Sequence, residues 1–339
     1  MNTARNYYYD KLAPEENYLN YQQIHQSDRF EADDPILLHV PLRSNCKLIE
    51  SYVDELISLT SPNVSKRLEK TFVAKKLNYL PNAGAVHDED SYDGDLIFFR
   101  VGLSDLLFQF AILFTKFVRL RKLKNDTDEY VQAFSKLCVD IETLTEAQLD
   151  WSMNNNEIRF GDNFLLPDND IVEQAVGVAT LMDKSILRHE ISHHILGHTK
   201  SKDVIHFDAV NEYLKDIKCT PNHLKELQAD LSGIYLPLSG FECKEIDVKQ
   251  VTIEVVLGTL LSQTVLAQLK SNILVESESH PSWYVRYTTS IDFIKKHYHD
   301  SVLNSITDDI SKFQALLYVV QDKGLGVLQK DLLREVNQV

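Results

Sequence analysis

The feature that most constrains this chain is a pair of histidines, His189 and His193, placed four residues apart in an amphipathic run. Between residues 170 and 197, apolar side chains recur at steps of three and four, as on one face of an α-helix. The two histidines continue that stripe, so one helical turn brings both imidazoles to the same face. The run therefore predicts a long helix that presents two nitrogen ligands to one metal ion. Gly197 is typical of the residue that follows a helix end.

Glu190 directly follows the first histidine and completes the sequence His-Glu-Ile-Ser-His. From that position its carboxylate can reach a water on the metal without binding the metal itself. Zinc lowers the pKa of a bound water to about 7, and a neighbouring carboxylate then takes the proton as a general base. The same five-residue pattern also arises by chance on ordinary amphipathic helices, so its interpretation depends on other parts of the chain.

A second predicted helix offers a third metal ligand. Glu226 stands 33 residues beyond His193, and Asp230 lies one turn later on the same face. Asp230 can accept a hydrogen bond from the free ring N–H of a ligand histidine. Apolar residues between and after the two acids distinguish this segment from a solvated charge run. Further along, His280 and Arg286 are candidates to stabilise the oxyanion that forms on a scissile carbonyl.

A short apolar strand is predicted at 96–101, ahead of the metal helix and after an acidic stretch, 82–95, that is expected to form a loop. An extended substrate can pair with a sheet edge through its backbone. The strand therefore supplies the candidates for substrate binding, which are Leu96, Ile97, Phe98, Phe99 and Arg100.

A second histidine pair, His194 and His198, stands on the neighbouring stripe of the metal helix. The residue after His194 is Ile195, so this pair lacks an adjacent base. Both histidines are interpreted as flanking polar residues rather than metal ligands.

The whole chain is expected to be mainly helical, an α+β fold of gluzincin type with a small mixed sheet ahead of the metal helix and a helical C-terminal part. Three regions are predicted: 1–80, of unassigned role, a metallopeptidase core at 81–300, and C-terminal helices at 301–339 that pack on the core. Residues 1–35 are polar and are expected to be poorly packed. Besides the strand above, the periodicity predicts a strand at 36–40 and helices at 48–59, 65–76, 104–122, 127–144, 169–197, 222–235, 246–270, 281–297 and 305–320.

Charge and hydropathy exclude two classes of partner. The chain has 35 basic and 50 acidic residues, a net charge of -15. Nucleic acids and anionic membrane surfaces require clustered Lys and Arg, so neither is expected as a partner. The most apolar stretches, 106–120 and 255–269, are interrupted by polar residues, whereas a membrane span needs about 20 predominantly apolar residues.

Cysteine usage and the first residues favour the cytoplasm. The four cysteines are scattered through the 339 residues, a pattern that favours free thiols in a reducing compartment. Residues 1–10 lack the apolar segment of a signal peptide. A secreted protein with one or two disulfides stays open as the alternative.

Three runs, 186–193, 225–230 and 279–286, together resemble the Lit-type phage-exclusion peptidases of bacteria, and more loosely the HtpX and CAAX-prenyl metallopeptidases. The resemblance covers about residues 90–300. It implies one zinc ion per chain and assigns the site residues: His189, His193 and Glu226 as zinc ligands, Glu190 as the base, Asp230 orienting a ligand, and His280 and Arg286 at the oxyanion.

The resemblance also implies a role in antiviral defence. Lit cleaves elongation factor Tu when a phage capsid peptide is bound to that factor. A specific intracellular protein, with elongation factor Tu as the candidate, and a phage-derived trigger are therefore the expected partners. The chain departs from Lit in its longer N-terminal part, which leaves the target and the trigger open.

Two other functions remain open at this point. A zinc-binding regulatory or interaction protein would keep the metal helix as structure, without proteolytic turnover. The intact Glu190 argues against it, because a structural zinc site needs no base and usually fills its fourth position with Cys or His. A peptidase toxin with another target would carry the same motifs, and nothing in the sequence distinguishes it.

Overall fold

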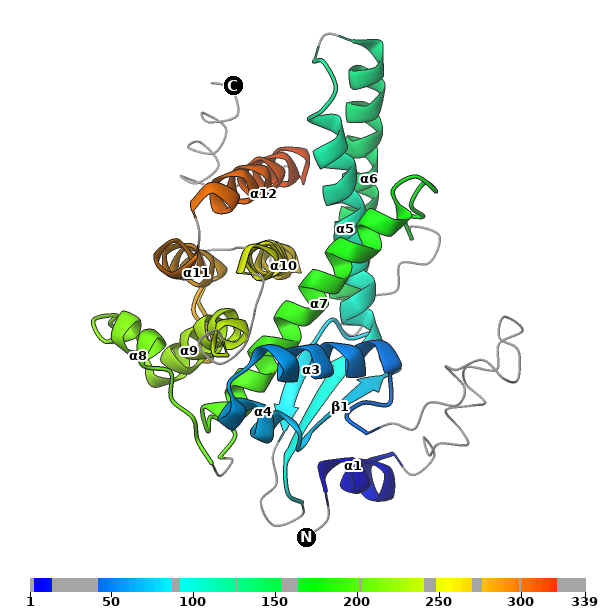
Figure 1. Ribbon diagram of the computed structural model, residues 1–339. Coiled ribbons are helices and arrows are strands. Elements are labelled where there is room, and N and C mark those ends of the chain that lie inside the picture. The colour runs from blue at the N-terminus through cyan, green and yellow to red at the C-terminus, as the bar shows by residue number, and fades with distance from the viewer. Residues whose placement is uncertain are drawn as a thin grey trace.

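The computed structural model describes residues 3–13, 42–86, 92–125, 127–153, 164–200, 203–240, 248–269, 276–298 and 300–321. This part of the chain confirms a mainly helical α+β fold with one small mixed sheet (Figure 1). The strands are β1 (Thr71–Lys76), β2 (Ala83–Val86) and β3 (Asp95–Arg100). The helices are α1 (Ala4–Tyr7), η1 (Tyr8–Leu12), α3 (Lys47–Leu59), α4 (Pro62–Leu68), α5 (Val101–Leu120), α6 (Asp128–Met153), α7 (Val172–Ile195), α8 (Asp208–Leu214), α9 (Pro221–Tyr235), η4 (Leu236–Leu238), α10 (Val248–Leu269), α11 (Trp283–His297) and α12 (Asp300–Gln321).

The sheet has the order β1-β3-β2, with β1 parallel and β2 antiparallel to the central strand β3. Gly94 makes the entry into β3 possible, because its φ of 103° is a conformation that side chains rarely adopt. A Cβ atom there would lie 2.3 Å from the carbonyl oxygen of Lys70. The glycine therefore lets β3 start directly beside the start of β1.

Both faces of the sheet are covered, which explains why its strands are apolar in nearly continuous runs. On one face, Ile97 and Phe99 join the main helical core. On the other face, Phe72 and Leu96 pack against Tyr8 of η1. Tyr8 is fully buried, so residues 3–13 are packed on the sheet and the expectation of a loose lead-in is wrong for them.

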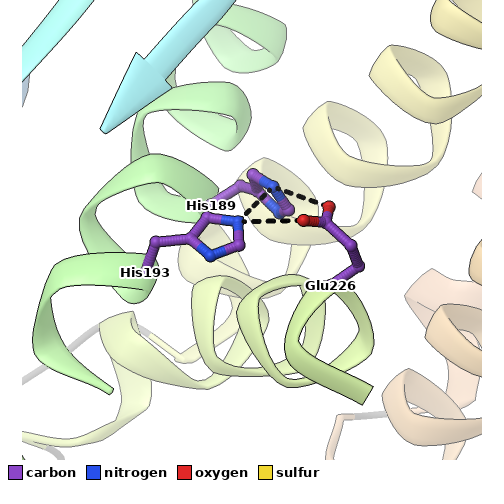
Figure 2. Close-up of side chains that lie close together, drawn as sticks. All are labelled: His189, His193 and Glu226. Carbon is purple, nitrogen blue, oxygen red and sulfur yellow. Dashed lines mark hydrogen bonds and ion pairs between the residues drawn. The ribbon is translucent and has the colours of Figure 1, made fainter. Parts of the chain in front are cut away.

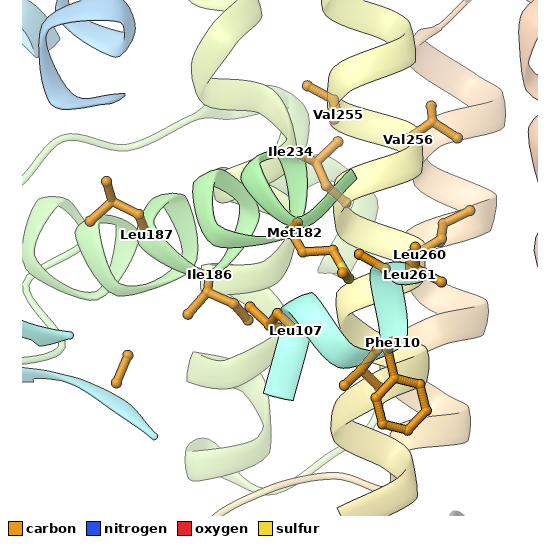
Figure 3. Close-up of a cluster of buried hydrophobic side chains, with 14 of the residues drawn as sticks. Leu107, Phe110, Met182, Ile186, Leu187, Ile234, Val255, Val256, Leu260 and Leu261 are labelled. Atoms are coloured by element: carbon orange, nitrogen blue, oxygen red, sulfur yellow. The ribbon is translucent and has the colours of Figure 1, made fainter. Parts of the chain in front are cut away.

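The main core forms where α7 crosses α5 and α10 (Figure 3). Met182 and Ile186 of α7 meet Leu107 of α5 and Leu260 of α10 in one cluster. Gly258 sits at the crossing, since a Cβ atom there would lie 2.3 Å from the carbonyl oxygen of Leu181. This close approach fixes α7, the helix of the predicted metal motif, at the centre of the molecule.

Most predicted helices are present with ends shifted by a few residues, although the helix predicted at 127–144 continues to Met153. Two predictions before residue 100 are wrong. The stretch 65–76 is not one helix: α4 ends at Leu68, and β1 begins at Thr71. Its Thr, Phe and Val residues fit a pleated surface well, and pairing with β3 decides the outcome. The expected acidic loop begins instead with a strand, β2. The predicted strand at 36–40 lies outside the described residues.

The predicted division at residue 80 does not coincide with a change of core. It falls between β1 and β2, and both strands pair with β3. The C-terminal helix α12 packs on the same core, where Phe313 contacts Phe114 and Phe117 of α5.

Two described helices have the length and composition of membrane spans, Val101–Leu120 of α5 and the window Lys249–Gln268 of α10. The buried shares of the two windows are 67% and 72%. Some of their polar residues find partners inside the protein: Gln109, for example, exchanges hydrogen bonds with the backbone of Leu165. This is the behaviour of core helices in a water-soluble protein.

The close crossing of α7 and α10 can be tested with a matched pair of glycine substitutions. We expect Gly258→Ala to lower the free energy of unfolding by roughly 1–3 kcal/mol, because the added methyl overlaps the α7 backbone. Gly177→Ala, in α7 with nothing within 4 Å of the added atom, should stabilise by up to about 1 kcal/mol through helix propensity. Denaturant unfolding measures both; an equal effect of the two changes would contradict the crossing.

Candidate metal centre

Helix α7 brings His189 and His193 together as the sequence predicts. Their Nε2 atoms are 3.1 Å apart, and the rings meet edge to face. The helix ends two residues later in a Schellman motif, with Gly197 at a φ of 74°. In this motif the N–H of His198 donates to the carbonyl of His193 at 2.9 Å. The turn therefore folds the chain back over the second histidine.

Helix α9 supplies Glu226 to the same point (Figure 2). One carboxylate oxygen lies 3.6 Å from Nε2 of His189, and the other lies 3.6 Å from Nε2 of His193. The three ligand atoms lie within 4.8 Å of one another, so this group could hold a metal ion. Gly233 permits the approach, because a Cβ atom there would lie 3.2 Å from the backbone nitrogen of His189.

Asp230 and Arg286 form a buried pair behind the first histidine. Oδ1 of Asp230 lies 2.9 Å from Nδ1 of His189. The Nε and Nη2 groups of Arg286 donate to the two Asp230 oxygens, both at 2.7 Å. Burial alone would raise the pKa of Asp230, but the Arg286 guanidinium holds it well below its ordinary value. The charged carboxylate thus orients His189 so that Nε2 faces the metal position, as predicted for Asp230.

The contacts of Arg286 are with acids rather than with an open oxyanion position. Two of its nitrogens donate to Asp230, and Nη1 lies 3.8 Å from a Glu226 oxygen. Its guanidinium also stacks over the ring of Trp283 at 4.3 Å. The geometry therefore makes Arg286 an anchor for Asp230, while a contact with substrate remains a prediction.

His280 lies at the entrance of the site. Its side chain is 43% exposed, and Nε2 is 3.6 Å from Glu226 Oε2. The hydroxyl of Ser279 lies 2.7 Å from the other ring nitrogen. The structure thus brings His280 to the metal-binding group, with a face open to an incoming ligand.

Glu190 lies beside the metal-binding group and close to β2. The backbone N–H of Ala85 donates to its carboxylate. Burial raises the pKa of this carboxyl, and the positive charge of His189 opposes the shift.

His198 takes part in the site although the sequence analysis set it aside. Its Nδ1 lies 3.0 Å from Nδ1 of His193, and its Nε2 lies 3.2 Å from Oε1 of Gln228. If His193 binds metal through Nε2, its Nδ1–H donates to His198, whose Nε2–H then donates to Gln228. Burial lowers the pKa of His198 to about 4, so this ring is neutral and can accept. The glycine helix end at Gly197 was the signal in the sequence for this folding back.

The neighbouring His194 is a structural residue. It is buried, with Nε2 3.1 Å from the carbonyl oxygen of Leu96 and Nδ1 2.9 Å from the hydroxyl of Thr199. The contact with Leu96 fastens the end of α7 to β3, and both contacts agree with the prediction that His194 is not a metal ligand.

The prediction that residues 96–100 bind substrate at a sheet edge does not fit the sheet, because they belong to its central strand, β3. Residues 96–99 of β3 pair with β1 on one side and with β2 on the other, so this strand has no open edge. Among the described strands, the sheet edge beside Glu190 is β2. Of the five predicted residues, only Arg100 lines the cavity next to the metal-binding group.

That cavity has a volume of about 460 Å³. Its lining comes from α7, α9, α10, α11 and the segment that leads into β2, and includes His189, Glu190, Glu226, His280 and Arg286. One side of the metal-binding group is therefore open to a ligand of side-chain size.

Comparisons with protein-family models, curated proteins and solved structures find no match to this chain. The function has to be argued from the site itself.

The hydrogen-bonded chain from His193 to Gln228 predicts a role for His198 in metal affinity. We expect His198→Ala to weaken zinc binding roughly 10- to 100-fold, because the Nδ1–H of His193 loses its acceptor. The control is His206→Ala, a change to an exposed histidine, which should leave the affinity unchanged. Competition with a chelator of known affinity measures both, and equal affinities would refute this role.

Proposed function

We propose that this chain is a zinc metalloendopeptidase of the gluzincin type. The observation that carries the proposal is the convergence of His189, His193 and Glu226, with Glu190 beside them and free of the ligand set. Two imidazole nitrogens and one carboxylate oxygen are the donor set of catalytic zinc, which keeps a further position open for water or substrate. The cavity on that side gives such a position room.

Zinc held here would polarise the scissile carbonyl and lower the pKa of a water in the open position to about 7. Glu190 would take the proton of that water and pass it to the leaving amine. Asp230 and His198 keep the two histidines in the tautomers that turn Nε2 toward the ion. His280, at the entrance, is placed to donate to the substrate oxygen as negative charge develops.

A peptide would bind along β2. This strand pairs only with β3 among the described strands, so its other edge offers backbone groups to an extended chain. The edge lies beside Glu190, since Ala85 donates to that carboxylate. Backbone pairing there would hold a scissile bond next to the base and the metal position.

The resemblance of the motif runs to Lit-type peptidases supports a defence role within this proposal. It suggests a cytoplasmic enzyme that cuts one host protein, with elongation factor Tu as the first candidate, after a phage-derived trigger. Cys46, Cys138 and Cys219 are free thiols in the structure, as a reducing compartment would keep them. Lysates of expressing cells with and without phage infection can be compared for truncated elongation factor Tu. Cleavage of other proteins only would leave the peptidase and change the target.

Glu190→Gln separates a peptidase from a metal-binding regulatory protein. We expect the variant to keep about one zinc per chain and to lose at least 10²–10⁴-fold in hydrolysis, because the amide cannot accept the water proton. Glu173→Gln, an exposed change on the same helix, is the matched control and should retain activity. In-cell cleavage profiles and zinc content measure both; an unchanged phenotype in Glu190→Gln would favour the regulatory protein.

A further inference from the structure

The cavity beside the metal-binding group is lined mainly by apolar surface, although the metal centre on one side of it is polar. Half-buried apolar side chains line it from three parts of the chain: Leu80 and Pro81 ahead of β2, Leu266 of α10 and Trp283 of α11. Ile186 of α7, one turn before the first metal-binding histidine, continues this lining toward the metal-binding group. We call Leu80, Pro81, Ile186, Leu266 and Trp283 the apolar wall.

The polar residues that α7 and α10 contribute to the lining are already paired within the protein. Ser262 Oγ donates to the carbonyl oxygen of Thr259 at 3.0 Å, and Ser185 Oγ donates to Thr259 Oγ1 at 3.2 Å. Gln263 Nε2 donates to Ser290 Oγ at 2.9 Å, and the Gln263 oxygen is buried away from the cavity surface. A ligand in the cavity therefore cannot reach that oxygen, and the hydroxyls have partners without it.

Trp283 gives the apolar wall a fixed aromatic surface. The Arg286 guanidinium stacks over its ring at 4.3 Å, and Arg286 is itself held by two hydrogen bonds to Asp230. Asp230 also orients His189 through a contact of 2.9 Å. The same ion pair therefore positions the aromatic ring and a metal-binding histidine, so a group bound against the ring lies at a defined place beside the metal position.

An apolar cavity next to a metal centre favours one class of side chain. Its volume of about 460 Å³ is that of a small-ligand pocket. Each CH₂ group that leaves water for such a surface strengthens binding up to about fourfold. A carboxylate or a carboxamide would lose its water and find few new partners there. Among the described residues that line the cavity, Arg100 is the charged one outside the metal centre, so an acidic side chain is the competing occupant.

We propose that the apolar wall binds a large apolar side chain, of the size of leucine or larger, in a substrate residue next to the scissile bond. The inference rests on the proposed peptidase function, because the metal centre defines which bond is cut. Leu80, Leu266 and Trp283 are then specificity-determining residues.

Zinc-binding probes with tails of the same shape test this without a known protein substrate. Isocaprohydroxamate, succinamic hydroxamate and succinic monohydroxamate share the metal-binding head and end in an isopropyl, a carboxamide and a carboxylate group. The zinc-loaded protein should bind the isopropyl compound at least roughly tenfold more tightly than either of the others. Equal binding of the three would overturn the inference, as would tighter binding of the carboxamide, or of the carboxylate through Arg100.

Leu266→Ala tests the wall itself. It should lower the advantage of isocaprohydroxamate over succinamic hydroxamate by roughly three- to tenfold and leave the affinity for acetohydroxamate, which has no tail, unchanged. Leu257→Ala is the matched control, because Leu257 is a partly buried leucine of the same helix that does not line the cavity. Equal loss in the two variants, or no loss in Leu266→Ala, would contradict the assignment. Leu80→Ala should act in the same direction and provides the second variant if Leu266→Ala does not fold.

Acetohydroxamate also separates this inference from the proposed function. If the protein binds zinc and acetohydroxamate but does not distinguish the three tails, the apolar wall is rejected and the peptidase proposal stands. If it binds neither, the metal centre is rejected, and the inference with it.

Discussion

The buried ion pair of Asp230 and Arg286 joins the two halves of the site. It links α9 to α11 through two hydrogen bonds of 2.7 Å and at the same time fixes the ring of His189. Removing two charges from water costs several kcal/mol per ion, and only good geometry with further partners offsets that loss. Here the further partners are a ligand histidine on one side and Glu226 on the other. The pair therefore contacts the metal-binding group directly, in addition to linking the two helices.

Helix α7 contributes both to the apolar core and to the candidate metal-binding site. Its middle turns supply apolar residues such as Met182 and Ile186 to the crossing with α5 and α10, and its last two turns carry the histidines and Glu190. Gly258 lies on α10 and Gly233 on α9, and each permits a close backbone contact with α7 that a larger residue would disturb. Close packing of this kind holds His189, His193 and Glu226 in fixed positions, as the proposed metal centre would require. The core and the candidate metal-binding site are parts of one helix assembly.

Features of the site that depend on spacing within one helix could be predicted from the sequence, whereas those that depend on packing between elements could not. The pairing of His189 with His193 follows from helical spacing alone, and Glu226 with Asp230 needs only a second helix. β2 was missed because its residues, Ala-Gly-Ala-Val, have little strand preference of their own, and pairing with β3 makes the strand. The edge position of a strand depends on the order of the sheet, which no local pattern gives.

The roles of Arg286 and His198 were not predicted from the sequence, for a related reason. Arg286 could be placed near the site by its distance from Glu226 in the chain, but its pairing with Asp230 depends on how α11 packs on α9. His198 lies beyond the end of α7, so helical spacing does not predict its position. The Schellman turn brings it back to His193. In both cases the contact is created by a helix end or a helix crossing rather than by periodicity.

We propose that His189, His193 and Glu226 hold one zinc ion with a position left open. X-ray absorption at the zinc edge of the loaded protein tests it most directly, because the spectrum reports the kind and number of ligand atoms. We expect nitrogen and oxygen neighbours at about 2.0–2.2 Å, with outer scattering from two imidazoles and no sulfur. A sulfur shell near 2.3 Å, or scattering from three or more imidazoles, would contradict it.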